Sequence, residues 1–215
     1  MTHHVPASLL FDYATGALPE GPALAVSTHL SYCGECLAAL GRLEAVGGAV
    51  LQSLEPAAVD SELLSRALAR LDEHGADEHR TEPEDAADGS LPPVLRPYLA
   101  TTLAEARWRF VAPHVRAARL ALAGPAHRAS LLRVPAGRTV PRHTHRGVEY
   151  TVVLSGGFTD RGQAYRRGDF CAADPPVKHQ PVAMDDGECL CLSVLDAPVR
   201  PTGRIGRLIA PFLPR

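Results

Sequence analysis

Three residues with metal-binding side chains lie within eight positions near the N-terminus. They are His29, Cys33 and Cys36, with spacings of four and three residues. A helix end and a turn can direct all three side chains at one point, and two thiolates with an imidazole suit tetrahedral zinc. A structural site needs a fourth ligand, and His3 and His4 are the nearby candidates, on a segment that could fold back. We therefore predict a zinc site that ties the N-terminal segment to two helices.

Two other interpretations of this cluster compete with zinc. Cys33 and Cys36 could be core residues, because cysteine is often buried for packing alone. They could also form a thioredoxin-like redox pair, but that needs a βαβ context, which is missing from this part of the sequence. The coincidence of three ligand side chains in so short a stretch favours metal. The total of five cysteines is odd, which argues against a disulfide framework.

A second cluster of metal-binding side chains follows Gly137. His143 and His145 are two residues apart, so on a strand they point to the same face, and strand parity allows Glu149 to join them. His179 would supply a fourth ligand from a separate strand or turn. Three imidazoles and one carboxylate inside a small barrel form a mononuclear site for a divalent metal. Loop histidines beside an ordinary glutamate are the alternative, but a barrel interior cannot hold such polar groups unpaired without a large cost.

The helices that would carry the first cluster are predicted over residues 1–74. Apolar residues recur at helical spacing in four stretches, and Gly47 and Gly48 weaken the third of them. Asp60 caps the fourth helix, which extends to about His74. The apolar side of this helix carries Leu63, Leu64, Leu68 and Leu71. We expect the four helices to form one small core, and a domain of about 70 residues often needs a staple such as zinc.

The second cluster lies in a part of the chain with a different pattern. Residues 75–93 have no apolar period, which predicts an acidic flexible linker. In residues 94–215, short runs of β-forming residues alternate with turns rich in Gly and Pro. These runs cover 128–134, 150–154, 170–172 and 189–195. The predicted fold class is therefore multidomain α + β, with a helical domain at 1–74 followed by a β-barrel at 94–215.

Composition and charge limit the class of protein. With 46% hydrophobic and 21% charged residues, the chain is globular and not disordered. No run approaches the ~18 apolar residues of a membrane-spanning helix, and the N-terminus lacks the layout of a signal peptide, so we expect a cytoplasmic protein without membrane contact. Residues 1–90 hold 15 acidic and 4 basic residues. This excess argues against direct nucleic-acid binding there and suits a basic partner, although the acidic linker explains part of it.

The first cluster and its helical frame resemble the zinc-binding anti-sigma domain. Members of that family sequester extracytoplasmic-function sigma factors. By position, His29, Cys33 and Cys36 match the zinc motif of the family. His4 matches the ligand near the N-terminus, with His3 beside it as the other candidate.

The second cluster is similar to the metal site of the cupin fold. The first cupin motif is matched at each of its fixed positions, from Gly137 through the two histidines and Glu149 to Gly156. Gly168 and His179 stand at the separation of the second motif, whose other positions depart from the usual residues. The resemblance implies a cupin β-barrel that binds Zn²⁺ or another divalent metal.

A zinc anti-sigma domain followed by a cupin resembles the ChrR-type anti-sigma factors, and the likeness covers nearly the whole chain apart from the linker. It implies that the N-terminal domain, with bound Zn²⁺, holds a sigma factor inactive. The cupin would release the sigma factor in response to singlet oxygen or organic hydroperoxides, and the chain would not be an enzyme. The fourth helix would offer Leu64, Leu68 and Leu71 to the sigma factor as a helix in a groove, unless this stripe belongs to the core of the domain itself.

Two rival functions compete with regulation through the cupin. In one, oxidation of Cys33 and Cys36 ejects zinc and releases the partner directly. In the other, the chain is a metal-dependent cupin enzyme, a dioxygenase or isomerase, with a helical interaction module. Cys171, Cys189 and Cys191 could be oxidation targets in the cupin, but core packing is the role that we expect for them.

Overall fold

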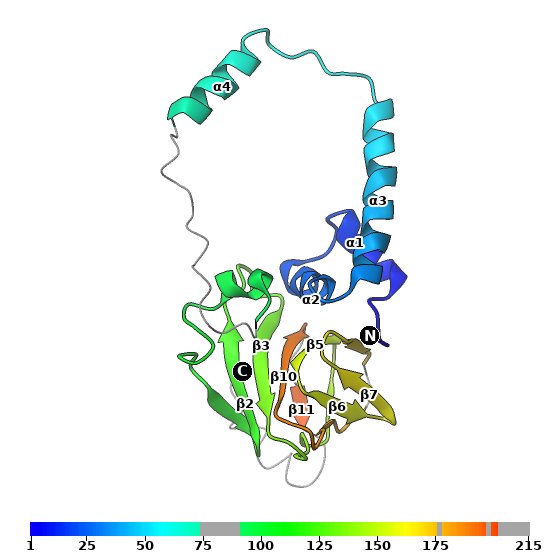
Figure 1. The fold of residues 1–215 in the computed structure, drawn as a ribbon, viewed down its shortest axis with the longest axis vertical. Helices are drawn as coiled ribbons and strands as arrows, with labels where there is room; N and C mark the ends of the chain where they lie inside the picture. Colours follow the sequence, from blue (N-terminus) through cyan, green and yellow to red (C-terminus); the bar gives the residue numbers. More distant parts are fainter. Residues whose placement is uncertain (74–90, 176–177, 197–198, 202–215) are drawn as a thin grey trace.

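The computed structural model describes residues 1–73, 91–175, 178–196 and 199–201. Helices form the N-terminal part and antiparallel strands form most of the remainder, as Figure 1 shows. The helices are α1 (Ala7–Ala14), α2 (Glu20–Leu30), α3 (Gly34–Ser53) and α4 (Leu63–Glu73). The predicted fold class, helices followed by an antiparallel β-domain, is confirmed.

The third helix is longer and more regular than the sequence pattern indicates. The Cys33 thiol caps its start, because Sγ accepts a hydrogen bond from the backbone N–H of Cys36 at 3.4 Å. We expected Gly47 and Gly48 to weaken the helix, but it continues through both and ends at Ser53. One glycine in a helix interior costs about 1 kcal/mol relative to alanine, and the flanking alanine, leucine and glutamate residues are good helix formers that offset this.

The fourth helix stands apart from the other three. Residues 63–71 are all exposed, and Figure 1 places α4 away from α1, α2 and α3. Its start is fixed by Asp60, whose carboxylate accepts a hydrogen bond from the backbone N–H of Glu62 at 2.9 Å and pairs with Arg66. The expectation that all four helices share one core is therefore wrong. An apolar stripe predicts that a helix has a partner surface, but it does not say which surface that is.

The β-domain is built from short antiparallel strands in three sheets. The largest sheet has six strands in the order β1-β2-β3-β10-β5-β8, the second has the order β7-β6-β9, and β11 pairs with β4. The strands are β1 (Arg109–Ala112), β2 (Val115–Leu120), β3 (Arg128–Val134), β4 (His143–His145), β5 (Glu149–Ser155), β6 (Gly157–Asp160), β7 (Gln163–Arg166), β8 (Phe170–Ala173), β9 (Val182–Ala183), β10 (Cys189–Leu195) and β11 (Val199–Pro201). The four β-runs predicted from the sequence correspond to β3, β5, β8 and β10, which lie in the largest sheet.

Helix α2 joins the helical part to the β-domain. Leu24 of α2 is buried in one apolar cluster with Val152 of β5 and Leu192 of β10. At Gly21 the helix comes so close to the β-domain that an added Cβ would lie 2.7 Å from the Cβ of His127, so only glycine fits there. The two parts of the molecule therefore share a hydrophobic core.

The predicted linker lies mostly outside the described residues, because 74–90 are not among them. Its last residues are packed, since Leu91 is half-buried against the shared core and is followed by the short helix η2 (Pro93–Tyr98). The domain boundaries at 74 and 94 stay a prediction. Within the described ranges, no helix is long and apolar enough to cross a membrane.

Candidate metal centres

The first predicted cluster assembles where the N-terminal segment meets α2 and α3. His4 precedes α1, His29 lies in the last turn of α2, and Cys33 and Cys36 flank the start of α3. One ligand atom from each of these four residues lies within 4.8 Å of the others. The Nδ1 atom of His4 is 3.3 Å from the Sγ atom of Cys33 and 3.5 Å from that of Cys36. The structure thus brings together the two cysteines and two histidines that the sequence analysis placed at one site.

The ring of His29 is oriented as a metal ligand requires. Its Nδ1–H donates a hydrogen bond of 2.7 Å to the carbonyl oxygen of Gly168 in the β-domain. Its Nε2 atom faces the cluster and is buried without a hydrogen-bond partner among the described residues. Burial lowers the pKa of His29, which favours the neutral ring that binds metal. A carbonyl that fixes the tautomer of a ligand histidine is a usual outer partner of a metal site.

His3, the other candidate for the fourth ligand, points elsewhere. Its backbone N–H donates a hydrogen bond of 3.1 Å to the carboxylate of Asp169, and its ring lies 4.2 Å from the ring of Tyr165. Between the two neighbouring histidines, the structure therefore places His4 at the cluster and uses His3 to contact the β-domain.

The two thiols of the first cluster are buried. Burial raises the pKa of the Cys36 thiol, so without a metal this thiol is protonated at neutral pH. A bound zinc ion would displace that proton, because thiolate is the form that binds zinc. Burial of both Cys33 and Cys36 also limits the access of an oxidant, which disfavours direct oxidation of this pair as the primary signal.

The second predicted cluster is buried inside the β-domain. His143 and His145 lie on β4, Glu149 begins β5, and His179 is held by a two-way backbone bridge to His143. The Nε2 atoms of His143 and His179 are 2.8 Å apart. The Oε2 atom of Glu149 lies 3.6 to 3.7 Å from the Nε2 atoms of all three histidines. Ligand atoms of His143, Glu149 and His179 all lie within 4.8 Å of one another, whereas His145 contacts Glu149 but lies outside this group.

Each histidine ring in this cluster is held in place by a hydrogen bond at its Nδ1 atom. The Nδ1 atoms of the three histidines bond to the carbonyls of Pro141 and Gly147 and to the carboxylate of Asp160, at 2.7 to 3.0 Å. With Nδ1 bonded, the Nε2 atom of each ring is the one left to bind a metal. The Nε2 atom of His145 and the Oε2 atom of Glu149 are buried and have no hydrogen-bond partner among the described residues. Buried unpaired acceptors are costly, and a divalent cation would satisfy them together.

Electrostatics keep the carboxylate of the second cluster ionised. Burial alone would raise the pKa of Glu149, but its contacts with His143 and Ser193 hold that pKa below its ordinary value. Burial opposes a charge on His143, yet the neighbouring Glu149 raises the pKa of this ring. Burial lowers the pKa of His179. A bound cation would compete with protonation of His143.

Asp160 is a residue that the sequence analysis did not identify. It ends β6, is buried, and orients His179 through the 3.0 Å contact between Oδ2 and Nδ1. No spacing rule links it to the ligands, because it lies in a different sheet from Glu149. The one signal in the sequence that could have indicated Asp160 is a carboxylate at the end of a strand whose other residues are mostly buried.

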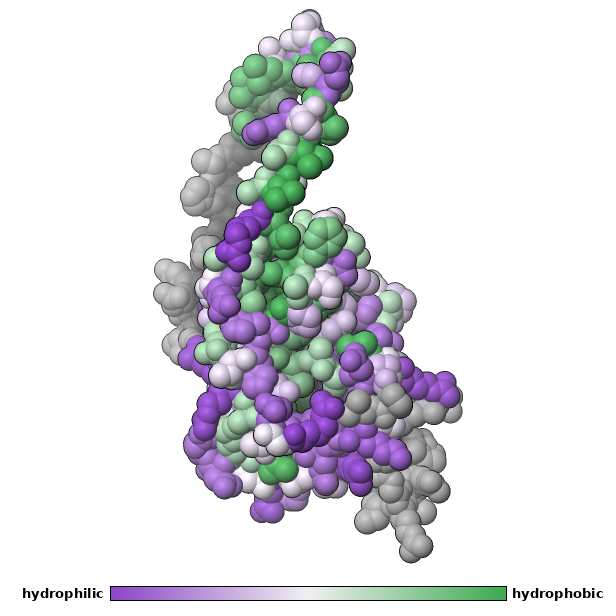
Figure 2. All heavy atoms as spheres, turned by 90° about the vertical axis from the view of Figure 1, so that its right-hand side faces the viewer, coloured by the Kyte–Doolittle hydropathy of each residue, from purple (hydrophilic) through white to green (hydrophobic). Residues whose placement is uncertain are grey.

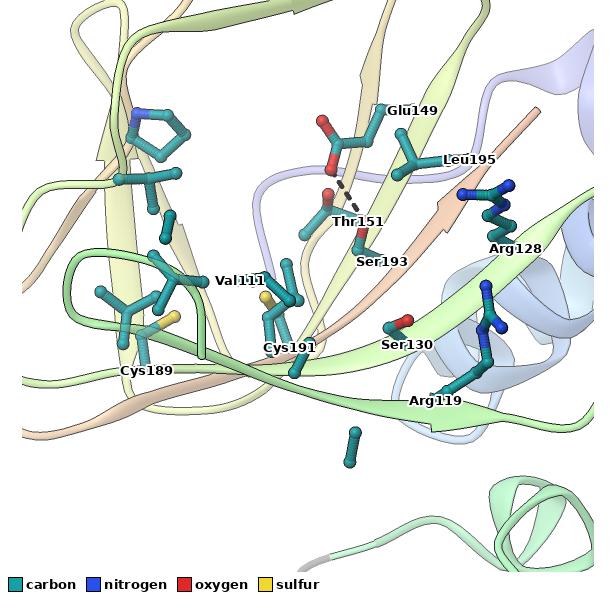
Figure 3. Close-up of a pocket in the computed structure, with 18 of the residues that line it drawn as sticks. Val111, Arg119, Arg128, Ser130, Glu149, Thr151, Cys189, Cys191, Ser193 and Leu195 are labelled. Atoms are coloured by element: carbon teal, nitrogen blue, oxygen red, sulfur yellow. Dashed lines mark hydrogen bonds between the residues drawn. The ribbon is translucent and has the colours of Figure 1, made fainter. Parts of the chain in front are cut away.

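The second cluster opens onto a cavity of about 910 Å³ within the β-domain. Figure 3 shows part of its lining, with Glu149 held by the 2.8 Å hydrogen bond that the Ser193 hydroxyl donates. The thiols of Cys189 and Cys191 lie on the same side of the cavity. This centre therefore combines three histidines and one carboxylate with space for a further molecule.

The remaining cysteines are buried in the β-domain. Burial raises the pKa of the Cys171 thiol to about 11. Contact with Cys189, followed by burial, raises the pKa of Cys191 well above its ordinary value. The thiols of Cys171 and Cys191 are therefore protonated at neutral pH, which fits the core role expected for these residues.

Comparison with known proteins extends over nearly the whole chain. A family model described as the ChrR cupin-like domain matches residues 98–197. The anti-sigma-E factor ChrR of Cereibacter sphaeroides is 40% identical over 210 residues, which cover 98% of this chain and 97% of that protein. The crystal structure of Rhodobacter sphaeroides SigE in complex with the anti-sigma ChrR matches with a TM-score of 0.77 and 38% identity, covering 89% of this chain and 97% of that chain.

Proposed function

Because this chain belongs to the ChrR family of anti-sigma factors, we propose that it binds and inhibits an extracytoplasmic-function sigma factor through its N-terminal helices. The cupin domain would trigger release under oxidative stress, signalled by singlet oxygen or an organic hydroperoxide. The family member from Cereibacter sphaeroides is an anti-sigma-E factor, and the solved ChrR structure is a complex with SigE. The chain acts as a regulator in the cytoplasm, where sigma factors work, and it is not an enzyme.

The observation that carries this proposal is the exposed apolar arm formed by α3 and α4. Leu64, Leu68 and Leu71 occupy one side of α4 and are 69%, 52% and 70% exposed. In Figure 2 hydrophobic side chains also follow α3 above the body of the molecule, and Val50 and Leu51 on this helix are exposed. Large exposed apolar patches mark interaction sites, because their contact with water is unfavourable.

The exposure of the α4 leucines favours a role in docking over a role in the core of the helical domain. A core role would bury them against the other helices, whereas in the described part of the chain they face solvent. Burying one leucine side chain contributes about 2 kcal/mol, so three leucines in a groove of the sigma factor would supply a substantial part of the binding energy. The acidic residues of the N-terminal half favour a basic partner surface.

The first cluster would hold a structural Zn²⁺ ion. Nδ1 of His4, Nε2 of His29 and the thiolates of Cys33 and Cys36 provide four ligands of the types that zinc prefers. Zinc there would cross-link the segment before α1 to the end of α2 and the start of α3. This fixes the base of α3, and so fixes the direction in which the apolar arm leaves the molecule.

The second cluster would hold Zn²⁺ or another divalent cation as the sensing centre. Its proposed ligands are His143, His145, Glu149 and His179. Ligand atoms of all but His145 lie within 4.8 Å of one another, and the buried unpaired atoms of His145 and Glu149 support a cation there. A divalent cation supplies Lewis acidity toward an oxygen-containing molecule in the adjoining cavity. The protein holds Glu149 in place through Ser193.

A short path connects the two centres. Glu149 on β5 is the register partner of Ala173 at the end of β8. At the start of β8, the backbone N–H of Phe170 donates a hydrogen bond of 3.0 Å to the carbonyl of His3. Gly168, two residues earlier, accepts the hydrogen bond from His29. A shift of β8 would therefore move the N-terminal segment and a ligand of the first centre together.

The test of this function is binding of the full-length chain to an extracytoplasmic-function sigma factor encoded in the same genome. We expect stable co-purification of the two proteins. The double substitution Leu64→Ala/Leu68→Ala should weaken binding about 100-fold or more without loss of zinc, because it removes two buried anchors.

Phe110→Ala is the matched control, since Phe110 on β1 is 69% exposed and lies outside the helical part. Wild-type affinity of the leucine variant would exclude α4 as the docking element. Loss of zinc in that variant would instead favour a core role for the stripe.

A further inference from the structure

The cavity beside the second centre is larger than a metal-bound water or peroxide needs. Its volume is about 910 Å³, at the upper end of the range of about 300–1,000 Å³ that is typical of pockets for drug-sized organic ligands. His143, Glu149 and His179 line one side of it. The rest of its lining indicates the chemical class of molecule that it would hold.

The floor of the cavity is one face of the six-stranded sheet. The strand register sets Thr151, Ser193, Ser130 and Arg119 in one row across β5, β10, β3 and β2. All four residues line the cavity. A polar row therefore runs from the side of Glu149 toward an arginine.

Two arginines meet at the far end of this row. Arg119 is the register partner of Ser130, and Arg128 lies two residues from Ser130 on the same face of β3. Figure 3 shows both guanidinium groups on the same side of the cavity, away from Cys189. Neighbouring like charges on one sheet face repel each other unless an anion lies between them.

No described acidic residue neutralises these two arginines. Neither of them forms an ion pair with a residue in the described ranges, and the acids that line the cavity are Glu149 and Asp160, which contact histidines of the metal cluster. Arg107 and Arg109 add further positive charge to the lining. A carboxylate is the anion that a pair of guanidinium groups binds with the best geometry.

Most of the remaining lining is apolar. Val111 and Val115 face the cavity from β1 and β2, Leu132 and Val134 from β3, and Phe158 from β6. These side chains offer hydrocarbon contact but few hydrogen-bond partners. They suit the alkyl part of a ligand whose charged end lies at the arginines.

We propose that this cavity binds an amphiphilic carboxylic acid of medium chain length. Its carboxylate pairs with Arg119 and Arg128, and its alkyl chain lies against the apolar lining near Val115 and Leu132. A molecule held there contacts Ser193, whose hydroxyl donates to Glu149 of the metal cluster. The ligand class deepens the proposed function, and only its role in releasing the sigma factor rests on that function.

The test is calorimetric titration of the full-length, metal-loaded protein with decanoate. We expect saturable binding, with decanol binding at least about tenfold more weakly because it lacks the charge. The double variant Arg119→Gln/Arg128→Gln should weaken decanoate binding by about tenfold or more. Arg66→Gln/Arg70→Gln on α4 removes the same number of charges far from the cavity and should bind decanoate as the wild type does.

Three results would overturn the proposal. These are no binding of decanoate, equal binding of decanoate and decanol, and unchanged binding by the Arg119/Arg128 variant. Loss of decanoate binding only in His143→Ala would place the carboxylate on the metal and contradict its pairing with the arginines. Because no sigma factor enters this titration, decanoate binding by a chain that fails to bind any sigma factor would refute the proposed function and leave this inference standing.

Discussion

The two candidate metal centres orient their buried histidines in the same way but differ in their surroundings, and the half-buried His4 is the exception because its Nδ1 atom faces the two cysteines. In both, buried rings are fixed through Nδ1 by a backbone carbonyl or a carboxylate, which leaves an Nε2 atom facing the cluster. The first centre draws four ligands, two of them thiols, from the N-terminal segment and two helices. The second has three histidines around one carboxylate, and it opens onto a cavity of about 910 Å³. A full set of protein ligands suits a structural zinc, whereas access to a cavity suits a centre that meets a further molecule.

This difference favours separate tasks for the two regions. In the proposed function, the first centre would fix the base of the apolar arm, and the second centre adjoins a cavity in which a signal molecule would bind. The β-domain contacts the first region at the turn before β8 and at the start of this strand. There Gly168 accepts a hydrogen bond from His29, and Phe170 donates one to His3. Substitutions at the first centre, at the second centre and at the contact between the two regions should therefore impair different properties of the protein.

The largest effect is expected at the first centre. Cys36→Ala should abolish zinc binding there, unfold the helical part and eliminate sigma binding, because structural zinc supplies about 10–16 kcal/mol in small zinc domains. Zinc content by mass spectrometry and helicity by circular dichroism would measure the loss. Cys171→Ala, a buried cysteine of the β-domain, is the control and should keep one zinc ion in the helical part. A folded, sigma-binding Cys36→Ala protein would refute a structural role for this centre.

A substitution at the second centre should separate metal binding from sigma binding. Glu149→Gln removes the charge that faces three histidines and should weaken the affinity of the cupin metal by about 100-fold. Sigma binding should stay at the wild-type level, since α3 and α4 do not contain this centre. Metal titration and sigma affinity would be measured on the same preparation. Loss of sigma binding together with the metal would show that the two regions are not separable in this way.

The Asp169 contact should give a pH-dependent effect of intermediate size. Burial alone would raise the pKa of Asp169, but backbone hydrogen bonds from Arg166, Thr2 and His3 hold it below its ordinary value of 3.8. Its contribution to stability is therefore present above about pH 4 and is lost as the pH falls through the lowered pKa. Asp169→Asn should reduce the free energy of unfolding at pH 7 by about 1–3 kcal/mol.

Denaturant unfolding at a series of pH values would check this prediction. The difference between wild type and Asp169→Asn should shrink as the pH falls below 4, and a difference that stays constant with pH would contradict the proposed role of the carboxylate. Asp186→Asn is the control, because Asp186 pairs with Arg166 at the surface and does not contact the N-terminal segment.

The smallest effect is expected at Gly168. Its φ is +87°, and an added Cβ would lie 2.9 Å from atoms of Met1 and Tyr32. Gly168→Ala should cost about 1–2 kcal/mol from the backbone alone and should push the N-terminal segment away from the turn. Hydrogen exchange of residues 2–4 would detect the loosened contact. Gly162→Ala is the matched control, since Gly162 also has a positive φ, of +78°, but no atom within 4 Å of an added Cβ.

Strand parity and short-range spacing explain how much of the site the sequence could predict. His143 and His145 share one face of β4 because they are two residues apart, as the sequence predicted. Glu149 begins β5 in a different sheet, so the fold and not strand parity brings it to the two histidines. The Cys33 and Cys36 pair is likewise close because one caps the helix that carries the other. Such relations depend on local geometry, which a sequence displays directly.

Long-range relations could not be predicted from the sequence. The hydrogen bond from His29 to Gly168 joins residues 139 positions apart, and the partner is a backbone carbonyl, which any residue provides. Asp160 was missed for the same reason, because a fold and not a spacing brings it to His179. The apolar stripe of α4 predicted a partner surface, but whether that surface belonged to the chain itself required the structure.

The most direct test of the account is induction of a sigma-dependent reporter by singlet oxygen in cells that carry either the wild-type chain or the variant His143→Ala/His145→Ala. We predict that the second centre senses the signal and that the first centre only holds the apolar arm. In light with a photosensitiser, the reporter should then stay repressed in cells with the variant and be induced in cells with the wild-type chain. Induction of the variant to the wild-type level would contradict this division of tasks and would move the sensing step to the Cys33–Cys36 centre.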